Sequence, residues 1–266
     1  MTACTGGSIT CVATTQPAPE VCGNAADDDC DGAVDEGLEP TGWEVRITNS
    51  ATPSSPLQVL WTGSEYAVLY HESLGSSSVP VIHLQRVDAS GALIGSPSVL
   101  TPATATSWHG RIAWNGTEYA LVYWTYETWP DDAVRFQRVA SDGTLIGAPI
   151  DINPNPSSQP DIVWNGTDYA VTWMTRVGSQ MLFRRISSTG AFVTSTATLG
   201  PAHSIGEIAW TGSQYGVTWD LYDYNASNNT GYFTRVSAAG VLAKLARTPV
   251  IRYGFAHGSE FAHLML

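Results

Sequence analysis

Hydrophobic and polar residues alternate in short runs along most of the chain, and turns rich in Gly, Asn, Ser and Thr separate the runs. In YAVTW, at residues 169–173, the side chains of Tyr169, Val171 and Trp173 fall on one face of an extended strand. The run YAVLY at 66–70 has the same alternation. Sustained helical periodicity and helix-capping patterns are absent from the sequence. The pattern therefore predicts an all-β protein.

The alternating runs belong to an internal repeat of about 50 residues. Its first motif appears as WTGSEYAVLY, WNGTEYALVYW, WNGTDYAVTW and WTGSQYGVTW, which begin at Trp61, Trp114, Trp164 and Trp210. A second motif follows each copy and places a glycine five residues after an arginine, at Arg86, Arg138, Arg185 and Arg235. We expect the repeated Trp and Tyr side chains to lie in the core and the arginines to brace neighbouring strands or blades.

Each repeat is expected to form four short strands. In the third repeat these are DIVW, YAVTW, MLFRRIS and a fourth strand after a glycine-centred turn, with Asn-Gly at 165–166 joining the first two. Asn-Gly between apolar runs is a strong signal for a two-residue hairpin turn, in which both residues adopt positive φ. Four strands per repeat of this length are typical of a β-propeller blade.

The ends of the repeat region resemble parts of a blade. Residues 42–56 resemble the fourth-strand segment 144–160, and residues 257–266 resemble the hairpin segment 62–70. The sequence therefore predicts a β-propeller of about five four-stranded blades over residues 41–266, with the last blade incomplete and closed by the N-terminal strand. The alternative is a truncated chain from which further blades are missing.

Composition limits the partners and the compartment. The net charge is −12, and 14% of the 266 residues are charged, which argues against nucleic acid and anionic membranes as partners. No apolar run is long enough to span a membrane, and no signal peptide is recognisable at the N-terminus. All cysteines lie near the start of the chain, and their even number and short spacing favour two disulfides over zinc. Three pairings are open, of which we favour Cys4–Cys11 and Cys22–Cys30, in a secreted or cell-surface protein.

An acidic stretch, DDDCDGAVDEG, lies among these cysteines. Asp27, Asp29 and Asp31 alternate before Gly32, as in the opening of a calcium loop. The remaining oxygen ligands would come from Ala33, Asp35 and Asn24. We expect one Ca²⁺ site of modest affinity, with Kd on the order of 10⁻⁴–10⁻³ M, although another divalent metal could occupy it. The alternative is a solvated acidic loop held by a disulfide.

The segment EVCGNAADDDCDGAVDEG, residues 20–37, resembles the MopE-type metal-binding motif of bacterial secreted and surface proteins. The resemblance implies metal binding by a small disulfide-rich module, which we assign to residues 1–40. The WNGTEY-type repeats are similar to propeller-like repeats of large bacterial surface proteins, and this similarity implies no ligand.

Variable loops indicate the binding face. The expected loops between the second and third strands differ in every repeat, at 71–80, 125–134, 175–180 and 220–231, and variable loops on a fixed scaffold commonly carry binding residues. Two of them combine aromatic residues with carboxylates, as a glycan or protein ligand would need. These candidates are Tyr126, Trp129, Asp131, Asp132, Asp220, Tyr222, Asp223 and Tyr224.

The sequence contains no recognisable catalytic motif. Its histidines lack zinc-ligand spacing, and no Gly-x-Ser-x-Gly segment is present. The first prediction is therefore a non-enzymatic binding or adhesion protein. One alternative is a propeller glycoside hydrolase or lyase acting on polysaccharide, with carboxylates such as Asp132 and Asp220. Another is a purely structural repeat segment of a larger surface protein.

Overall fold

The computed structural model describes residues 3–5, 8–10, 44–48, 52–73, 79–126, 132–153, 156–204, 206–223, 228–242 and 248–254. The chain divides into two compact units, Met1–Arg46 and Ile47–Leu266. In the first unit, β1 (Ala3–Thr5) pairs with β2 (Ser8–Thr10) as an antiparallel hairpin. Cys4 lies in β1, but the structure does not describe its side chain. The other cysteines, all the predicted calcium ligands and the predicted boundary after residue 40 also lie outside the described residues.

The described residues of the second unit form four antiparallel sheets of four strands each, and within every sheet the strands pair in chain order. The first blade contains β3 (Ser54–Trp61), β4 (Glu65–Ser73), β5 (Pro80–Asp88) and β6 (Leu93–Val99). The second contains β7 (Thr106–Trp114), β8 (Glu118–Tyr126), β9 (Ala133–Ala140) and β10 (Leu145–Asn153). The third contains β11 (Ser157–Trp164), β12 (Asp168–Thr175), β13 (Gln180–Ser187) and β14 (Ala197–Pro201). The fourth contains β15 (Glu207–Trp210), β16 (Gln214–Asp223), β17 (Asn228–Ser237) and β18 (Thr248–Gly254).

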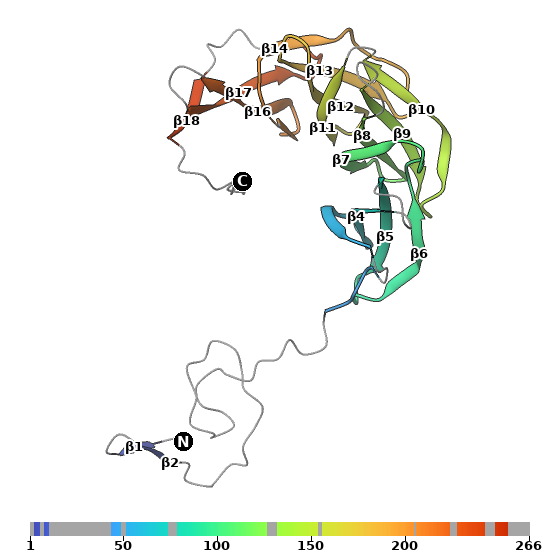
Figure 1. Ribbon diagram of the computed structural model, residues 1–266, viewed down its shortest axis with the longest axis vertical. Helices are drawn as coiled ribbons and strands as arrows, with labels where there is room; N and C mark the ends of the chain where they lie inside the picture. Colours follow the sequence, from blue (N-terminus) through green and yellow to red (C-terminus); the bar gives the residue numbers. More distant parts are fainter. Residues whose placement is uncertain are drawn as a thin grey trace. The chain divides into compact units, whose positions relative to one another are not determined.

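The four sheets follow one another in an arc, as blades of a β-propeller do. Figure 1 shows β7 and β11 on the inner side of the arc and β6, β10 and β14 on its outer side. The first strands of successive blades, β3, β7, β11 and β15, contact one another. The predicted all-β, propeller-like repeat fold is confirmed. In the described parts of the chain, no helix could cross a membrane.

The Asn-Gly turns differ from the predicted two-residue hairpin. Gly116 has φ of 100°, whereas Asn115 does not adopt positive φ, so the prediction of a turn with two positive-φ residues is wrong. Instead, the Asn115 side-chain oxygen accepts hydrogen bonds from the backbone N–H groups of Thr117 and Glu118, at 2.8 and 2.9 Å. In the first blade the Thr62 hydroxyl accepts from the N–H of Glu65 in the same way, at 3.1 Å. The side chain therefore stabilises a slightly longer turn, which explains why both Asn and Thr occur at this position.

The strands extend further into the predicted variable loops than the sequence pattern indicated. β16 and β17 remain paired as far as Asp223 and Asn228, so the predicted loop 220–231 is largely strand. Tyr126 likewise belongs to β8. Polar residues continue these strands because backbone pairing in an antiparallel hairpin does not require apolar side chains.

Core side chains fill the space between successive blades. Tyr119, Tyr169 and Tyr215, which occupy one position in three repeats, are completely buried. The repeated tryptophans pack on these rings, with centroids 4.5–4.7 Å apart, but remain partly exposed. The core prediction is therefore confirmed for these three tyrosines and corrected for the tryptophans, which cover the end of the core beside the turn rather than fill it.

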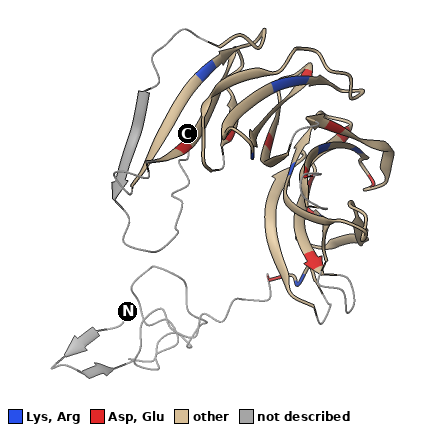
Figure 2. Ribbon diagram, turned by 45° about the horizontal axis from the view of Figure 1, so that its top comes forward, with Lys and Arg blue, Asp and Glu red and all other residues tan. Residues whose placement is uncertain are grey.

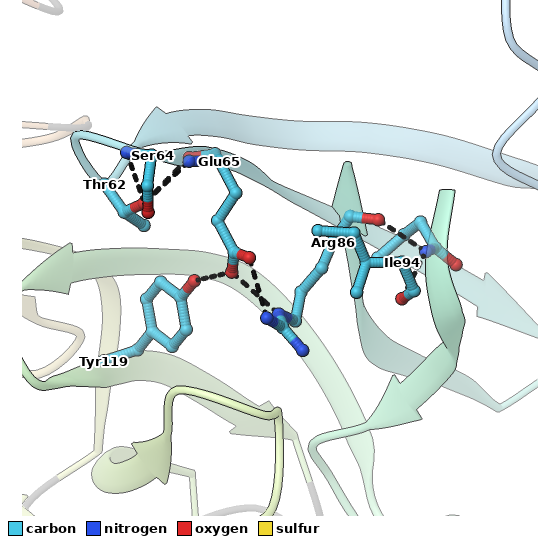
Figure 3. A network of polar contacts seen from close by, with 7 residues as sticks. Thr62, Ser64, Glu65, Arg86, Ile94 and Tyr119 are labelled. Carbon is cyan, nitrogen blue, oxygen red and sulfur yellow. Dashed lines mark hydrogen bonds and ion pairs between the residues drawn. The ribbon is translucent and has the colours of Figure 1, made fainter. Parts of the chain in front are cut away.

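A carboxylate–arginine pair joins the second and third strands of each of the first three blades. Arg86 donates to both carboxylate oxygens of Glu65 at 2.7 Å, and the Tyr119 hydroxyl of the next blade donates to the same carboxylate at 3.1 Å (Figure 3). These contacts, the Arg86 hydrogen bond foremost, lower the pKa of Glu65. The corresponding pairs are Arg138 with Glu118 and Arg185 with Asp168. The predicted bracing role of these three arginines is confirmed.

Candidate functional site on the inner strands

The inner strands carry a polar residue three positions before each repeated tryptophan. These equivalent positions are Gln58 in β3, Arg111 in β7, Asp161 in β11 and Glu207 in β15. Because β3, β7, β11 and β15 are neighbours, the four positions follow one another along the inner side of the arc. Charged side chains are sparse on the blades as a whole, as Figure 2 shows, so this set of three charges on neighbouring strands is unusual.

A β-bulge comes just before this position in each of the first three blades. The register shifts between Pro56 and Gln58 in β3, and the corresponding shifts in β7 and β11 end at Arg111 and Asp161. His109 and Gln159, in the bulges of β7 and β11, have φ of 49° and 54°, which is uncommon for residues other than glycine. Backbone of this kind typically costs about 1–3 kcal/mol. Bulges commonly re-aim the side chains next to them.

Gln58 and Asp161 each link their own blade to the next. The Gln58 amide accepts from the N–H of Ile112 at 2.8 Å and donates to its carbonyl at 3.1 Å. Asp161 Oδ2 accepts from the N–H of Ile208, the equivalent residue of the fourth blade, at 2.8 Å. In both contacts the side chain binds a backbone group at the free edge of the next inner strand, where no further strand of the same sheet pairs with it.

The same position in the second blade cannot do this, because the guanidinium of Arg111 has no acceptor atom. Arg111 instead donates to the carbonyls of Leu57 and Gly110, at 3.2 and 3.1 Å. An amide or a carboxylate at the position of Arg111 could accept a hydrogen bond from the N–H of Ile162. In its place, the N–H of Ile162 donates to Asp161 Oδ1 at 2.9 Å. Asp161 therefore has a backbone donor on each of its two oxygens.

Asp161 has an unusual electrostatic environment. It is enclosed by protein, although part of the residue remains accessible to solvent, and burial raises the pKa of its carboxyl to about 6. The hydrogen bonds from Ile208 and Ile162 and the charge of Arg111 oppose this rise in pKa, whereas the charge of Glu207 adds to it. Glu207 itself is exposed. The site thus combines an enclosed carboxyl that keeps its proton up to about pH 6 with a second, solvent-facing carboxylate within its electrostatic reach.

Aromatic and histidine side chains lie close together around the bulge of β7. His109 stacks on Trp124 with centroids 5.7 Å apart, and the His71 ring meets the edge of Trp108 at 5.2 Å. The Arg176 guanidinium lies 5.5 Å from the centre of the Trp124 ring, in cation–π geometry. Burial lowers the pKa of both histidines, so neutral imidazoles are favoured here.

The structure does not gather the predicted ligand-binding residues that it describes into one site. Asp132 is buried and forms an ion pair with Arg176 of the third blade, so it holds two blades together instead of facing a ligand. Asp220 is half-buried, and burial raises its pKa. Tyr222 lies two residues later in β16, and the backbone N–H of Tyr222 donates to His203 Nδ1. Tyr126, at the end of β8, is exposed beside Trp124. The side chains of Trp129, Asp131, Asp223 and Tyr224 lie outside the described residues.

Sequence reasoning missed the inner polar residues, although a signal for them exists. Each copy of the motif before the tryptophan has one polar residue in an apolar strand, as in LQVLW, GRIAW, PDIVW and GEIAW. In the described parts of the chain, no three His, Cys, Asp or Glu side chains are grouped to hold a metal ion.

No family model and no curated protein matches the chain. Solved structures with a similar fold include an exo-β-1,3-galactanase from Phanerochaete chrysosporium, with a TM-score of 0.52 and 14% identity over 76% of this chain. An endo-arabinase from Bacteroides thetaiotaomicron matches with a TM-score of 0.52 and 10% identity, over 75% of this chain and 81% of that one. A thermostable family-43 glycoside hydrolase matches with a TM-score of 0.52 and 12% identity, over 73% and 76% of the two chains. This chain spans about half of the galactanase, 51% of its length.

At these identities the likeness is one of fold. It nevertheless corrects the first functional prediction, because the folds that this chain resembles are those of glycoside hydrolases. The prediction of a non-enzymatic adhesion scaffold is therefore not carried further. The variable-loop residues on which the adhesion prediction rested include Asp132, which the structure buries in an ion pair.

Proposed function

We propose that this chain is a glycoside hydrolase that cleaves a polysaccharide at the inner strands of the propeller. One observation carries the proposal: an enclosed carboxyl, Asp161, whose pKa is raised to about 6, lies within electrostatic reach of the exposed Glu207. Glycoside hydrolysis commonly uses two carboxyl groups, one protonated as a general acid and the other acting as a base or nucleophile. Environments that give two carboxyl groups different proton affinities assign these roles.

In this proposal Asp161 donates its proton to the leaving glycosidic oxygen. Its burial keeps the proton in place at mildly acidic pH, and the charge of Glu207 favours the same state. Glu207, which faces solvent, activates water or attacks the anomeric carbon as the second carboxylate. Arg111 stabilises the Asp161 carboxylate that forms after proton transfer, because its charge favours the ionised form.

The aromatic group beyond the β7 bulge supports a sugar as substrate. Aromatic rings offer flat apolar faces, on which the C–H faces of sugar rings pack. Tyr126, at the end of β8, is exposed and provides such a face. The fold-level relatives are a β-1,3-galactanase, solved with β-1,3-galactotriose, and an endo-arabinase. We therefore take β-1,3-galactan and arabinan as the first substrates to test.

The test is release of reducing sugar from these two polysaccharides at pH 5, where the Asp161 carboxyl holds its proton. The wild-type chain is expected to release sugar from at least one of them, and Asp161→Asn and Glu207→Gln are each expected to reduce the rate at least about 100-fold. Asp151→Asn is the matched control, because Asp151 is an exposed carboxylate on the outer strand β10. No release by the wild-type chain, or equal rates for all variants, would overturn the proposal.

Two further proposals concern the N-terminal unit and rest on sequence alone. Residues 20–37 bind Ca²⁺ through the alternating aspartates, with the cysteines as disulfide staples. The protein is secreted or located at the cell surface, because such a module needs an oxidising compartment.

A further inference from the structure

Arg111 lacks a contact that its equivalents in the neighbouring blades make. Gln58 and Asp161, at the same position of the first and third blades, each accept a hydrogen bond from an N–H group on the inner strand of the next blade. Arg111 has no acceptor atom, so the N–H of Ile162 donates to Asp161 instead. An amide at this position would serve the packing of the blades at least as well. The presence of an arginine here therefore points to a role other than packing.

The guanidinium of Arg111 has hydrogen-bond donors to spare. Its Nη1 atom donates to the carbonyls of Leu57 and Gly110, at 3.2 and 3.1 Å. Nε and Nη2 have no hydrogen-bond partner in the part of the chain that the structure describes, and neither atom is buried. In Arg185, by contrast, the Nε atom is buried. Arg111 therefore presents the N–H groups of Nε and Nη2 to solvent on the inner side of the blades.

Other arginines of this protein hold a carboxylate with these same two atoms. Arg86 donates from Nε and Nη2 to the two oxygens of Glu65, each at 2.7 Å (Figure 3). Arg138 holds Glu118 in the same way, at 2.8 and 2.7 Å. Two parallel charge-assisted hydrogen bonds match the planar geometry of a carboxylate and are strong for protein hydrogen bonds. Arg111 has the same pair of donors but forms no ion pair with any described residue.

The neighbouring groups leave the charge of Arg111 uncompensated in mildly acidic solution. Asp161 keeps its proton up to about pH 6. Burial lowers the pKa of His109, so this imidazole is neutral above its lowered pKa and adds no negative charge below it. Glu207 lies on β15, two blades after Arg111. Most of the net charge of −12 comes from the first unit, in which Arg46 is the only basic residue, and does not belong to the blades.

We infer that Arg111 binds the carboxylate of a uronic acid residue, so that the substrate is an acidic polysaccharide. The inference rests on the proposed function, which places a glycan at the inner strands. Nε and Nη2 donate to the two carboxylate oxygens, while Nη1 keeps its bonds to Leu57 and Gly110. A neutral sugar has a hydroxymethyl group in place of the carboxylate, with one acceptor oxygen and no charge. The neutral polysaccharides named above test the cleavage, and a uronic acid tests this neighbouring contact.

Galacturonic acid and galactose are matched probes, because they differ only in the group at C6. NMR titration of the full chain at pH 5 measures the Kd of each sugar. The wild-type chain is expected to bind galacturonic acid at least about 10-fold more tightly than galactose. Arg111→Gln should lose this preference and remain folded, because Gln58 shows that an amide is accommodated at this position. Arg111→Lys keeps the charge but not the pair of donors, and it should retain only part of the preference.

Arg135→Gln is the control for removal of a positive charge elsewhere. Arg135 lies on β9 and pairs with Asp151 on the outer strand β10, so this variant should keep the preference for galacturonic acid. Acetate is the control for a carboxylate without a sugar, and it should bind more weakly than galacturonic acid.

The inference would be overturned if the wild-type chain did not bind galacturonic acid or bound both sugars equally. A preference that survives Arg111→Gln, or acetate bound as tightly as galacturonic acid, would also overturn it. Binding does not require cleavage, so these results are separate from the test of the proposed function. Sugar release from a neutral polysaccharide without a preference for galacturonic acid would leave the hydrolase standing and refute only the role of Arg111. A preference without any sugar release would refute the hydrolase and keep Arg111 as a binding residue.

Discussion

Replacing Asp161 by asparagine should affect the stability of the protein more favourably at alkaline pH than at acidic pH. The folded protein holds the Asp161 proton up to about pH 6, whereas the ordinary pKa of the group is 3.8. A carboxyl whose pKa is raised by folding contributes stability that is fully present below its unfolded pKa and is lost as the pH rises through the folded value. Over about two pH units, at about 1.4 kcal/mol per unit, the wild-type chain loses about 3 kcal/mol from this group.

Asparagine cannot ionise, but its single acceptor oxygen can bind only one of the two backbone N–H groups that Asp161 binds, and the other N–H then faces the two donors of the amide nitrogen. Gln58 shows that an amide at the equivalent position can accept from the next inner strand, because its oxygen binds the N–H of Ile112. We therefore expect Asp161→Asn to lower the free energy of unfolding by about 1–3 kcal/mol at pH 4.5, because one backbone N–H loses its acceptor. At pH 8 we expect the effect of the substitution to be more favourable by about 2 kcal/mol, because only the wild-type chain loses the contribution of the Asp161 proton between these pH values.

Urea denaturation of both chains at pH 4.5 and pH 8 measures this difference. Asp151→Asn, on the outer strand β10, controls for loss of a carboxylate away from the inner strands, and it should give the same small change at both pH values. If Asp161→Asn shifted the free energy of unfolding equally at pH 4.5 and pH 8, or less favourably at pH 8, the electrostatic account of Asp161 would be refuted.

Three other predictions concern two contacts between blades and the expected calcium loop. Gln58→Ala should lower the free energy of unfolding by about 1–3 kcal/mol in urea denaturation, because the N–H of Ile112 loses its partner; an unchanged midpoint would contradict this. Glu65→Gln should destabilise the chain by about 1–2 kcal/mol, and in a Tyr119→Phe background the loss should be smaller; equal losses in both backgrounds would show that the hydroxyl contributes nothing. Calorimetry of the full chain should detect Ca²⁺ with Kd on the order of 10⁻⁴–10⁻³ M, and Asp29→Asn should abolish the heat; identical titrations of the two chains would rule out the proposed ligand.

Much of the fold could be predicted from the sequence, because the repeat places the same residues in the same environment. The alternation of Tyr169, Val171 and Trp173 identified a buried strand face, and the structure buries all three. The turn type was harder to predict, since the Asn115 side chain substitutes for a backbone conformation. The lengths of the hairpins were also underestimated, because β16 and β17 continue through polar residues that carry no alternating pattern.

The site was predicted poorly for a physical reason. Loop position suggested that Asp132 faces a ligand, whereas an ion pair with Arg176 of the next blade buries it. The pKa of Asp161 depends on Ile208 and Glu207, which lie in another repeat and approach only when the blades pack. A single strand such as PDIVW contains the carboxylate but not the enclosure that raises its pKa.

Hydrolysis in ¹⁸O-labelled water tests the central claim most directly. A glycoside hydrolase transfers one oxygen atom from water to the new reducing end of the product. The account predicts that the wild-type chain, with arabinan or β-1,3-galactan at pH 5, releases oligosaccharides that carry one ¹⁸O by mass spectrometry. It also predicts that Asp161→Asn, although folded, releases at least about 100-fold less labelled product in the same time. Absence of labelled product from the wild-type chain, or the same labelled product from Asp161→Asn, would contradict it.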